Sequence, residues 1–294
     1  MARLATEILD FYRRPAVMTA PGAHATRLEA LPRDPGALAQ VEHGLLLHEH
    51  FAPAYGETLS DQRRQESHIR PAAEMLDRIV ARDGRPLSVA RPVGERLVGV
   101  CRHFSVLAAA ALRANGIPAR ARCGFGAYFI SGKFEDHWVC EYWNEADGRW
   151  VLVDTQIDDL QRATLGVDFD LLDVPRDRFV IAGDAWLRCR EGGADPAAFG
   201  IFIMRGLWFV AGNVLRDFAS LNNMEMLPWD VWGAMVGPEQ PLDADGLALF
   251  DGLAALTQTP DSSFAEMRRL YEADDRLRVP ASVFNAVRNQ VEVI

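Results

Sequence analysis

The stretch from Cys101 to Ala114 constrains the fold more than any other part of the chain. It is rich in Ala and Leu, contains no Gly or Pro, and is followed closely by Gly116 and Pro118. Ala and Leu favour helices whereas Gly and Pro end them, so we predict a helix over residues 101–114. Cys101 then stands in the first turn, where the helix dipole and unpaired backbone N–H groups favour the nucleophilic thiolate.

Two strand-like segments follow this helix, joined by a short turn. They cover residues 137–143 and 149–154, with Ala146-Asp147-Gly148 between them. Such a hairpin brings its two ends, His137 and Asp154, to the same edge of a sheet.

His137 and Asp154 complete a predicted catalytic triad with Cys101. His137 lies 36 residues after Cys101 and 17 residues before Asp154, which is enough chain for the helix to place its N-terminus over that edge. In this triad Cys101 attacks, His137 transfers the proton, and Asp154 orients the imidazole. Asp136 is a poor alternative to Asp154, because neighbouring residues on a strand point to opposite faces.

Three motifs resemble the transglutaminase-like superfamily of papain-like thiol enzymes, in its bacterial type. They read GVCRHFS at the start of the helix, then DHWVCEY, then RWVLVD, and the resemblance covers roughly residues 90 to 160. It implies that the family's Cys, His and Asp fall on the three residues of the predicted triad. Two features differ from the family's usual pattern: Asp154-Thr155-Gln156 replaces a frequent D-P-T, and Cys140 stands where Val or Ala is ordinary.

The expected fold class is α+β. The resemblance implies a papain-like or transglutaminase-like core, in which the cysteine helix packs on an antiparallel sheet, with helical N- and C-terminal elaborations. We predict a helical N-terminal flank at 1–89, a catalytic core at 90–164, and a mostly helical C-terminal elaboration at 165–294 that could form a wall of the substrate cleft. Periodicity and breakers indicate further helices near the N-terminus and at 34–50, 71–84, 185–190, 205–221, 243–256 and 263–276, and a strand at 119–130.

Charge and composition exclude several kinds of partner. The chain carries 31 Lys and Arg against 41 Asp and Glu, a net charge of −10, so no nucleic-acid partner is expected. No window has 18 uninterrupted apolar residues and no secretory leader is apparent, so we expect no membrane association and a cytoplasmic location. Four cysteines in a chain of this length do not indicate a disulfide framework.

Several histidines and cysteines raise the question of a metal. His43, His48 and His50 fall in the predicted helix 34–50, where positions two apart diverge by about 200° and cannot share an ion. We therefore interpret these histidines as solvated or facing the substrate.

A zinc site built from residues around the triad is also unconvincing. The set would be Cys101, His103, Cys123, His137 and Cys140, which has no C-x-x-C pair. His103 is instead expected behind the site or in solvent, and Cys140 in the core. Gly124 and Gly126 do not extend to a dinucleotide fingerprint. We expect no metal and no cofactor.

Candidate substrate-binding residues are Trp138 and three residues of the loop 221–232, namely Asn222, Asn223 and Trp229. This loop mixes amides, carboxylates and tryptophans without periodicity. Aromatic walls with a few polar contacts are typical of substrate clefts. The same stretch could equally be an irregular connection through the core.

The resulting hypothesis is acyl transfer or hydrolysis through a thioester. Cys101 attacks an amide- or peptide-bearing substrate, and water or an amine acceptor resolves the thioester, with His137 as acid and base. The backbone N–H of Cys101 is one expected oxyanion donor. The alternative is a catalytically silent papain-like scaffold that binds a ligand or protein. The oligomeric state is not predicted.

Overall fold

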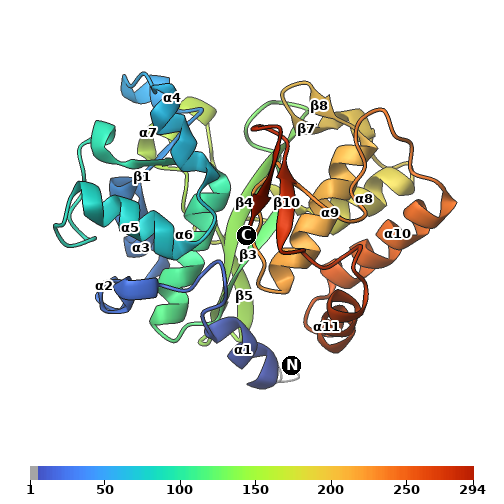
Figure 1. Ribbon diagram of the computed structural model, residues 1–294, viewed down its shortest axis with the longest axis horizontal. Helices are drawn as coiled ribbons and strands as arrows, with labels where there is room; N and C mark the ends of the chain where they lie inside the picture. Colours follow the sequence, from blue (N-terminus) through green and yellow to red (C-terminus); the bar gives the residue numbers. More distant parts are fainter. Residues whose placement is uncertain (1–5) are drawn as a thin grey trace. The chain divides into compact units, whose positions relative to one another are not determined.

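The computed structural model describes residues 6–294, and contains helices and strands along the whole of that range (Figure 1). The first five residues of the predicted N-terminal helix lie outside the described residues. The helices are α1 Thr6–Arg13, α2 Ala25–Glu29, α3 Pro35–Leu45, α4 Asp61–Arg64, α5 Ala72–Arg82, α6 Cys101–Ala114, α7 Asp159–Leu165, α8 Ala182–Arg190, α9 Leu207–Leu221, α10 Ala244–Gln258 and α11 Phe264–Ala273. The strands are β1 Leu46–His48, β2 Leu97–Gly99, β3 Ala119–Gly126, β4 Phe134–Asn144, β5 Arg149–Val153, β6 Phe179–Ile181, β7 Phe199–Ile201, β8 Met204–Arg205, β9 Asp230–Val231, β10 Ser282–Asn285 and β11 Gln290–Val293.

The chain divides into two compact units, and each is described by itself. Unit 1 comprises residues 1–121 and 139–175, and unit 2 comprises residues 122–138 and 176–294. The chain passes between the units within β3 and again within β4. The division into flank, core and elaboration made from the sequence remains a prediction.

Unit 1 is built around α6. Residues 101–113 of this helix are all buried, and its apolar side chains share one core with those of α2, α3 and α5. Ala119, Cys140 and Val153, from β3, β4 and β5, belong to the same core, so the helix packs on a sheet as expected. Cys140 is fully buried there, which agrees with its interpretation as a core residue.

The main sheet is mixed rather than purely antiparallel. Its strand order is β6-β3-β4-β7-β8, and β5 pairs with β4. The pairs β3–β6, β4–β5 and β7–β8 are antiparallel, whereas β4–β7 is parallel, with Phe134 opposite Phe199. The α+β class is confirmed, and the antiparallel sheet is corrected at this one pairing.

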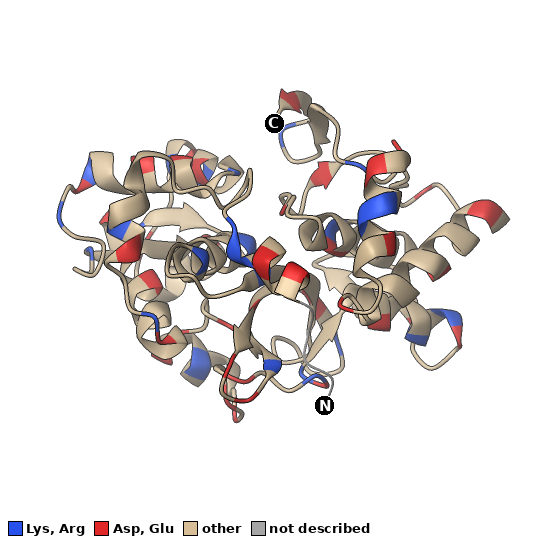
Figure 2. Cartoon of the chain, turned by 90° about the horizontal axis from the view of Figure 1, so that it is seen from below, with Lys and Arg blue, Asp and Glu red and all other residues tan. Residues whose placement is uncertain are grey.

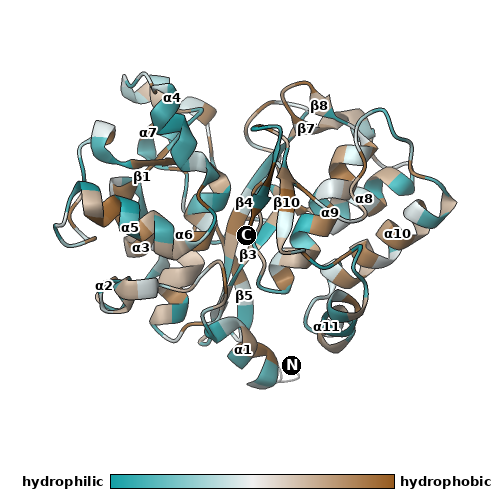
Figure 3. Ribbon diagram, viewed as in Figure 1, coloured by the Kyte–Doolittle hydropathy of each residue, from teal (hydrophilic) through white to brown (hydrophobic). Residues whose placement is uncertain are grey.

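The helix predicted over 34–50 ends five residues early. The α3 helix stops at Leu45, and Leu46 is extended, with φ −114° and ψ 149°. Residues 46–48 form β1, which pairs in parallel with β2 and sets His48 opposite Gly99. The three leucines at 45–47 suit a buried strand as well as a helix, so the distant partner strand decides the outcome. In Figure 3, β1 is hydrophobic and α4 is hydrophilic.

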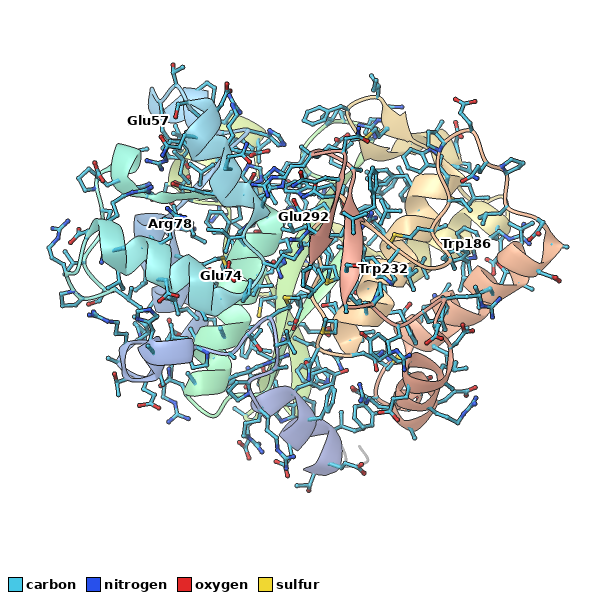
Figure 4. All side chains as sticks on the ribbon, in the orientation of Figure 1. Glu57, Glu74, Arg78, Trp186, Trp232 and Glu292 are labelled. Carbon is cyan, nitrogen blue, oxygen red and sulfur yellow. The ribbon has the colours of Figure 1, made fainter. Side chains whose placement is uncertain are left out.

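Unit 2 contains a layer of helices, which the sequence predicted, and a small sheet, which it did not. Helices α8, α9 and α10 contact one another pairwise (Figure 1). A Cβ atom at Gly183 would come within 2.4 Å of Thr257 Oγ1, so glycine permits the close approach of α8 and α10. Trp186 of α8 is buried and donates from Nε1 to Asp251 Oδ1 at 2.7 Å (Figure 4). Strands β9, β10 and β11 form a small antiparallel sheet in the part of the chain that was expected to be mostly helical.

Two of the buried arginines pair with carboxylates. Arg120 bonds Glu141 at 2.7 Å in unit 1, and its guanidinium lies 3.9 Å from the ring centre of Trp150. Arg122 makes two bonds to Asp217 of α9 in unit 2, at 3.0 and 2.8 Å. Asp217 Oδ1 also accepts the backbone N–H of Cys123 at 2.9 Å. These pairs fix the strand β3 to its neighbours in each unit.

Elsewhere, acidic and basic residues are interspersed along the ribbon (Figure 2). Within residues 6–294, no helix combines the length and apolarity needed to span a bilayer.

We predict that Asp217→Ala lowers the free energy of unfolding by about 3–5 kcal/mol, because it leaves the buried Arg122 guanidinium without its counter-ion. Urea denaturation measures the change. Glu266→Ala is the matched control, since it removes a carboxylate from an exposed pair with Arg269 and should cost less than about 1 kcal/mol. Equal losses in the two variants would contradict the importance of the buried pair.

Candidate active site

The candidate nucleophile begins a helix. Cys101 is the first residue of α6, whose bounds, 101–114, agree with the prediction, and the residue is 6% exposed. Val100 precedes the helix in an extended conformation, with φ −125° and ψ 177°. The first turn of a helix leaves backbone N–H groups without intrahelical partners, so the thiol lies beside donors that can stabilise negative charge.

His103 holds this turn in place. Its Nδ1 accepts the backbone N–H of Val100 at 3.1 Å, and the ring is fully buried. A Cβ atom at Gly99 would lie 2.8 Å from Cγ of this ring, so Gly99 provides the space for it. Burial, and then the nearby Arg102, lower the pKa of His103 to about 3, and the imidazole is neutral at physiological pH. His103 is therefore not exposed to solvent and is not available as a general base. It acts as an N-terminal cap of α6.

The depressed pKa of His103 predicts a loss of stability in acid. The unfolded chain binds a proton on this residue near pH 6.5 and the folded chain only near pH 3, so the unfolding free energy should fall as the pH drops through this interval. His103→Gln should flatten the profile, because glutamine at this helix position can still reach the Val100 N–H and does not titrate. Urea midpoints measured between pH 7.5 and 4.5 test this, and parallel profiles of the two proteins would refute it.

Asp154 directly follows β5 and is buried in unit 1. Its backbone N–H donates to the carbonyl oxygen of Leu171 at 2.9 Å, and its Oδ1 accepts the backbone N–H of Gln156 at 3.1 Å. Gln156 Nε2 donates in turn to Gln161 Oε1 at 2.9 Å, which ties the turn to α7. The carboxylate therefore stands on a turn with a fixed backbone.

His137 lies in β4 and is buried in unit 2. Its ring is enclosed by the rings of Tyr128, Phe129 and Phe179, with centroid separations of 5.7, 4.8 and 6.2 Å. The neighbouring Asp136 binds α9 instead, where Asn213 Nδ2 donates to its Oδ1 at 2.7 Å. Burial raises the pKa of Asp136. Strand alternation thus gives the two residues different surroundings, as expected.

The three triad residues do not all belong to the same unit: Cys101 and Asp154 are in unit 1, and His137 is in unit 2. Along β4, Cys140 comes three residues after His137 and is opposite Val153, the residue before Asp154. The assignment of the three as one catalytic group rests on the sequence motifs, and it is treated below as a proposal.

The four candidate substrate-binding residues are all buried or half-buried. Trp138 is 1% exposed, and its indole N–H has no hydrogen-bond partner among the described residues. Asn222 follows α9, donates to the Phe218 carbonyl at 2.8 Å and accepts from Arg268 at 2.9 Å. Asn223 has a positive φ of 62°, a conformation that asparagine tolerates at a helix end. Trp229 is half-buried.

The histidines of the N-terminal flank are arranged differently from the expectation. His48 lies in β1 and His50 in the following turn, and their ring centres are 5.4 Å apart, so the helical divergence assumed from the sequence is wrong. Even so, the part of the chain that the structure describes contains no group of three His, Cys, Asp or Glu residues suited to a metal ion.

Two residues of α3 approach the turn that carries Asp154. Sequence reasoning did not single out Glu42, and it interpreted His43 as solvated or facing the substrate. The buried carboxyl of Glu42 faces the Thr155 hydroxyl, and the ring of His43 lies against the Thr155 backbone. A glutamate in a helix of mostly apolar residues was the available signal, but the helix alone does not reveal its partner.

Comparison with known proteins agrees with the motifs. Residues 57–155 match the sequence model of the Transglutaminase-like superfamily. A solved structure of a candidate cysteine protease from Cytophaga hutchinsonii is 18% identical, with a TM-score of 0.34, and the match covers 62% of this chain and 50% of that one. Red sea bream transglutaminase is 16% identical, with a TM-score of 0.31, over 48% of this chain and 27% of that one. No curated protein matches.

Proposed function

Because residues 57–155 belong to the transglutaminase-like superfamily, we propose that the chain is a thiol enzyme that transfers or hydrolyses an acyl group through Cys101, His137 and Asp154. The position of Cys101 at the capped N-terminus of α6 carries this proposal. Two further observations support it: His137 and Asp154 both lie within the matched residues, and both are buried on ordered backbone.

The first half-reaction forms the thioester. The Cys101 thiolate adds to the carbonyl carbon of an amide, and the negative charge moves to the carbonyl oxygen, where the backbone N–H of Cys101 stabilises it. The carbon–nitrogen bond then breaks, and the imidazolium of His137 gives its proton to the departing nitrogen. Asp154 holds the imidazole in the required tautomer and stabilises its cationic form.

The second half-reaction releases the acyl group. Water or an amine attacks the thioester carbonyl, His137 takes the proton of the nucleophile, and the carbon–sulfur bond breaks to regenerate the Cys101 thiolate. The products are a carboxylic acid if water attacks and a new amide if an amine attacks. The substrate class is therefore an amide or peptide, with an amine as the possible second substrate.

The first test is the rate at which iodoacetamide labels each cysteine as a function of pH, followed by peptide mass mapping. Cys101 should react rapidly below pH 7, and His137→Ala should remove this reactivity, because the histidine stabilises the thiolate. Cys189 is an internal reference, since burial and then Asp195 raise its pKa to about 11. Labelling of Cys101 that rises only near pH 8.5, the ordinary thiol value, would favour a non-catalytic binding scaffold.

Cys101→Ala should abolish turnover of amide substrates while leaving the fold intact, because alanine favours the helical conformation and the substitution removes only the sulfur. Substrate screening with amides and amines gives the activity, and urea denaturation gives the stability. Cys123→Ala is the matched control, since it removes a fully buried thiol in unit 2. Undiminished turnover by purified Cys101→Ala would refute the assignment of the nucleophile.

A further inference from the structure

A helix outside the residues that match the family approaches the turn that carries Asp154. Thr155, the next residue, is approached by both Glu42 and His43 of α3, whereas the family match begins only at residue 57. All four residues belong to unit 1. The contacts therefore connect the N-terminal flank to the residue that follows Asp154 of the predicted triad.

A glutamate at position 42 is unfavourable for the stability of the fold. Its side chain is 1% exposed, and neither carboxyl oxygen has a partner in hydrogen-bond geometry among the described residues. Burial raises the pKa of Glu42 well above its ordinary value, and the nearby Thr155 hydroxyl offsets this only in part. A buried carboxyl without full compensation destabilises a fold, so its presence in an apolar helix calls for a reason other than packing.

His43 faces the charges of the same turn. Its ring lies against the Thr155 backbone and within electrostatic reach of Asp154, Asp158 and Arg96. Its Nε2 is buried without a partner among the described residues, which leaves Nδ1 for the Thr155 contact. Burial is the main cause that lowers the pKa of His43, which disfavours a cationic ring that would compete with His137 for Asp154.

We propose that Glu42 and His43 are positioning residues for Asp154: they fix the Thr155 turn from one side and so set the direction in which the carboxylate points. This inference rests on the proposed function, since it concerns the group that orients His137. It extends the catalytic assembly to α3, whose sequence carries none of the family motifs. Neither residue touches the reacting atoms, so neither is a catalytic residue.

The pH midpoint of Cys101 labelling reports this role. A correctly aimed Asp154 stabilises the His137 imidazolium and, through it, the Cys101 thiolate. Misplacing the carboxylate should move the midpoint to higher pH. For Asp154→Asn we expect a shift of about one pH unit, equivalent to about tenfold slower labelling at pH 6. Loss of the α3 contacts should give a smaller shift in the same direction, about threefold slower labelling.

Two matched pairs of variants separate positioning from packing. Glu42→Gln keeps a polar group of the same shape and should retain the wild-type midpoint, whereas Glu42→Leu should shift it even though the apolar side chain leaves the protein at least as stable. His43→Asn places a nitrogen near the Nδ1 position and should retain the midpoint, whereas His43→Gln places it near Nε2 and should shift it. His24→Asn, which removes a buried histidine bonded to Asp77 at 2.8 Å, is the control for general perturbation.

Each outcome is informative. Shifted midpoints for Glu42→Leu and His43→Gln, with wild-type midpoints for Glu42→Gln, His43→Asn and His24→Asn, support the inference. Wild-type midpoints in all the α3 variants, together with a shift in Asp154→Asn, would overturn it and leave the proposed function standing. A wild-type midpoint in Asp154→Asn would instead refute the role of Asp154 itself. Urea denaturation of every variant shows whether a shift accompanies a loss of stability.

Discussion

The N-terminus of a buried helix is the constraint on which the rest of unit 1 depends. A helix that buries every residue from 101 to 113 cannot leave its first backbone N–H groups to solvent, so the preceding turn must satisfy or use them. His103 satisfies the donor of Val100, and Gly99 gives the ring its space. The donors that remain lie beside the Cys101 thiol. The packing requirement and the chemistry thus act on the same few peptide groups.

The parts that could be predicted from sequence are those determined by local physics. The Ala- and Leu-rich run and its closing Gly and Pro determine α6, and the turn at Gly148, with φ 60°, determines the β4–β5 hairpin. Strand alternation correctly separates Asp136 from His137. These features need only propensity, turn geometry and period, which a single sequence contains.

The parts that could not be predicted depend on distant partners. Leu46 and Leu47 are compatible with a helix until β2 pairs with them, and β10–β11 is a short, half-exposed hairpin without a strong apolar pattern. From the sequence, His103 was expected behind the site or in solvent. Its role as a cap depends on the hydrogen bond from the Val100 backbone N–H to its Nδ1, which the sequence does not reveal. The contacts of Glu42 and His43 could not be predicted for the same reason: their partner, Thr155, lies more than a hundred residues away.

The pairing of β1 with β2 also affects how the protein can form during synthesis. β1 ends at His48 and β2 begins only at Leu97, so β1 has no partner while the intervening residues are being added. Closing a loop of this length costs entropy that only the finished pair repays. The turn before Cys101 can therefore form only after β2 has been synthesised. Until then, α3 and β1 lack the strand that leads into this turn. In a nascent chain that ends before residue 97, β1 lacks its partner strand, and unpaired strand edges favour association with other chains.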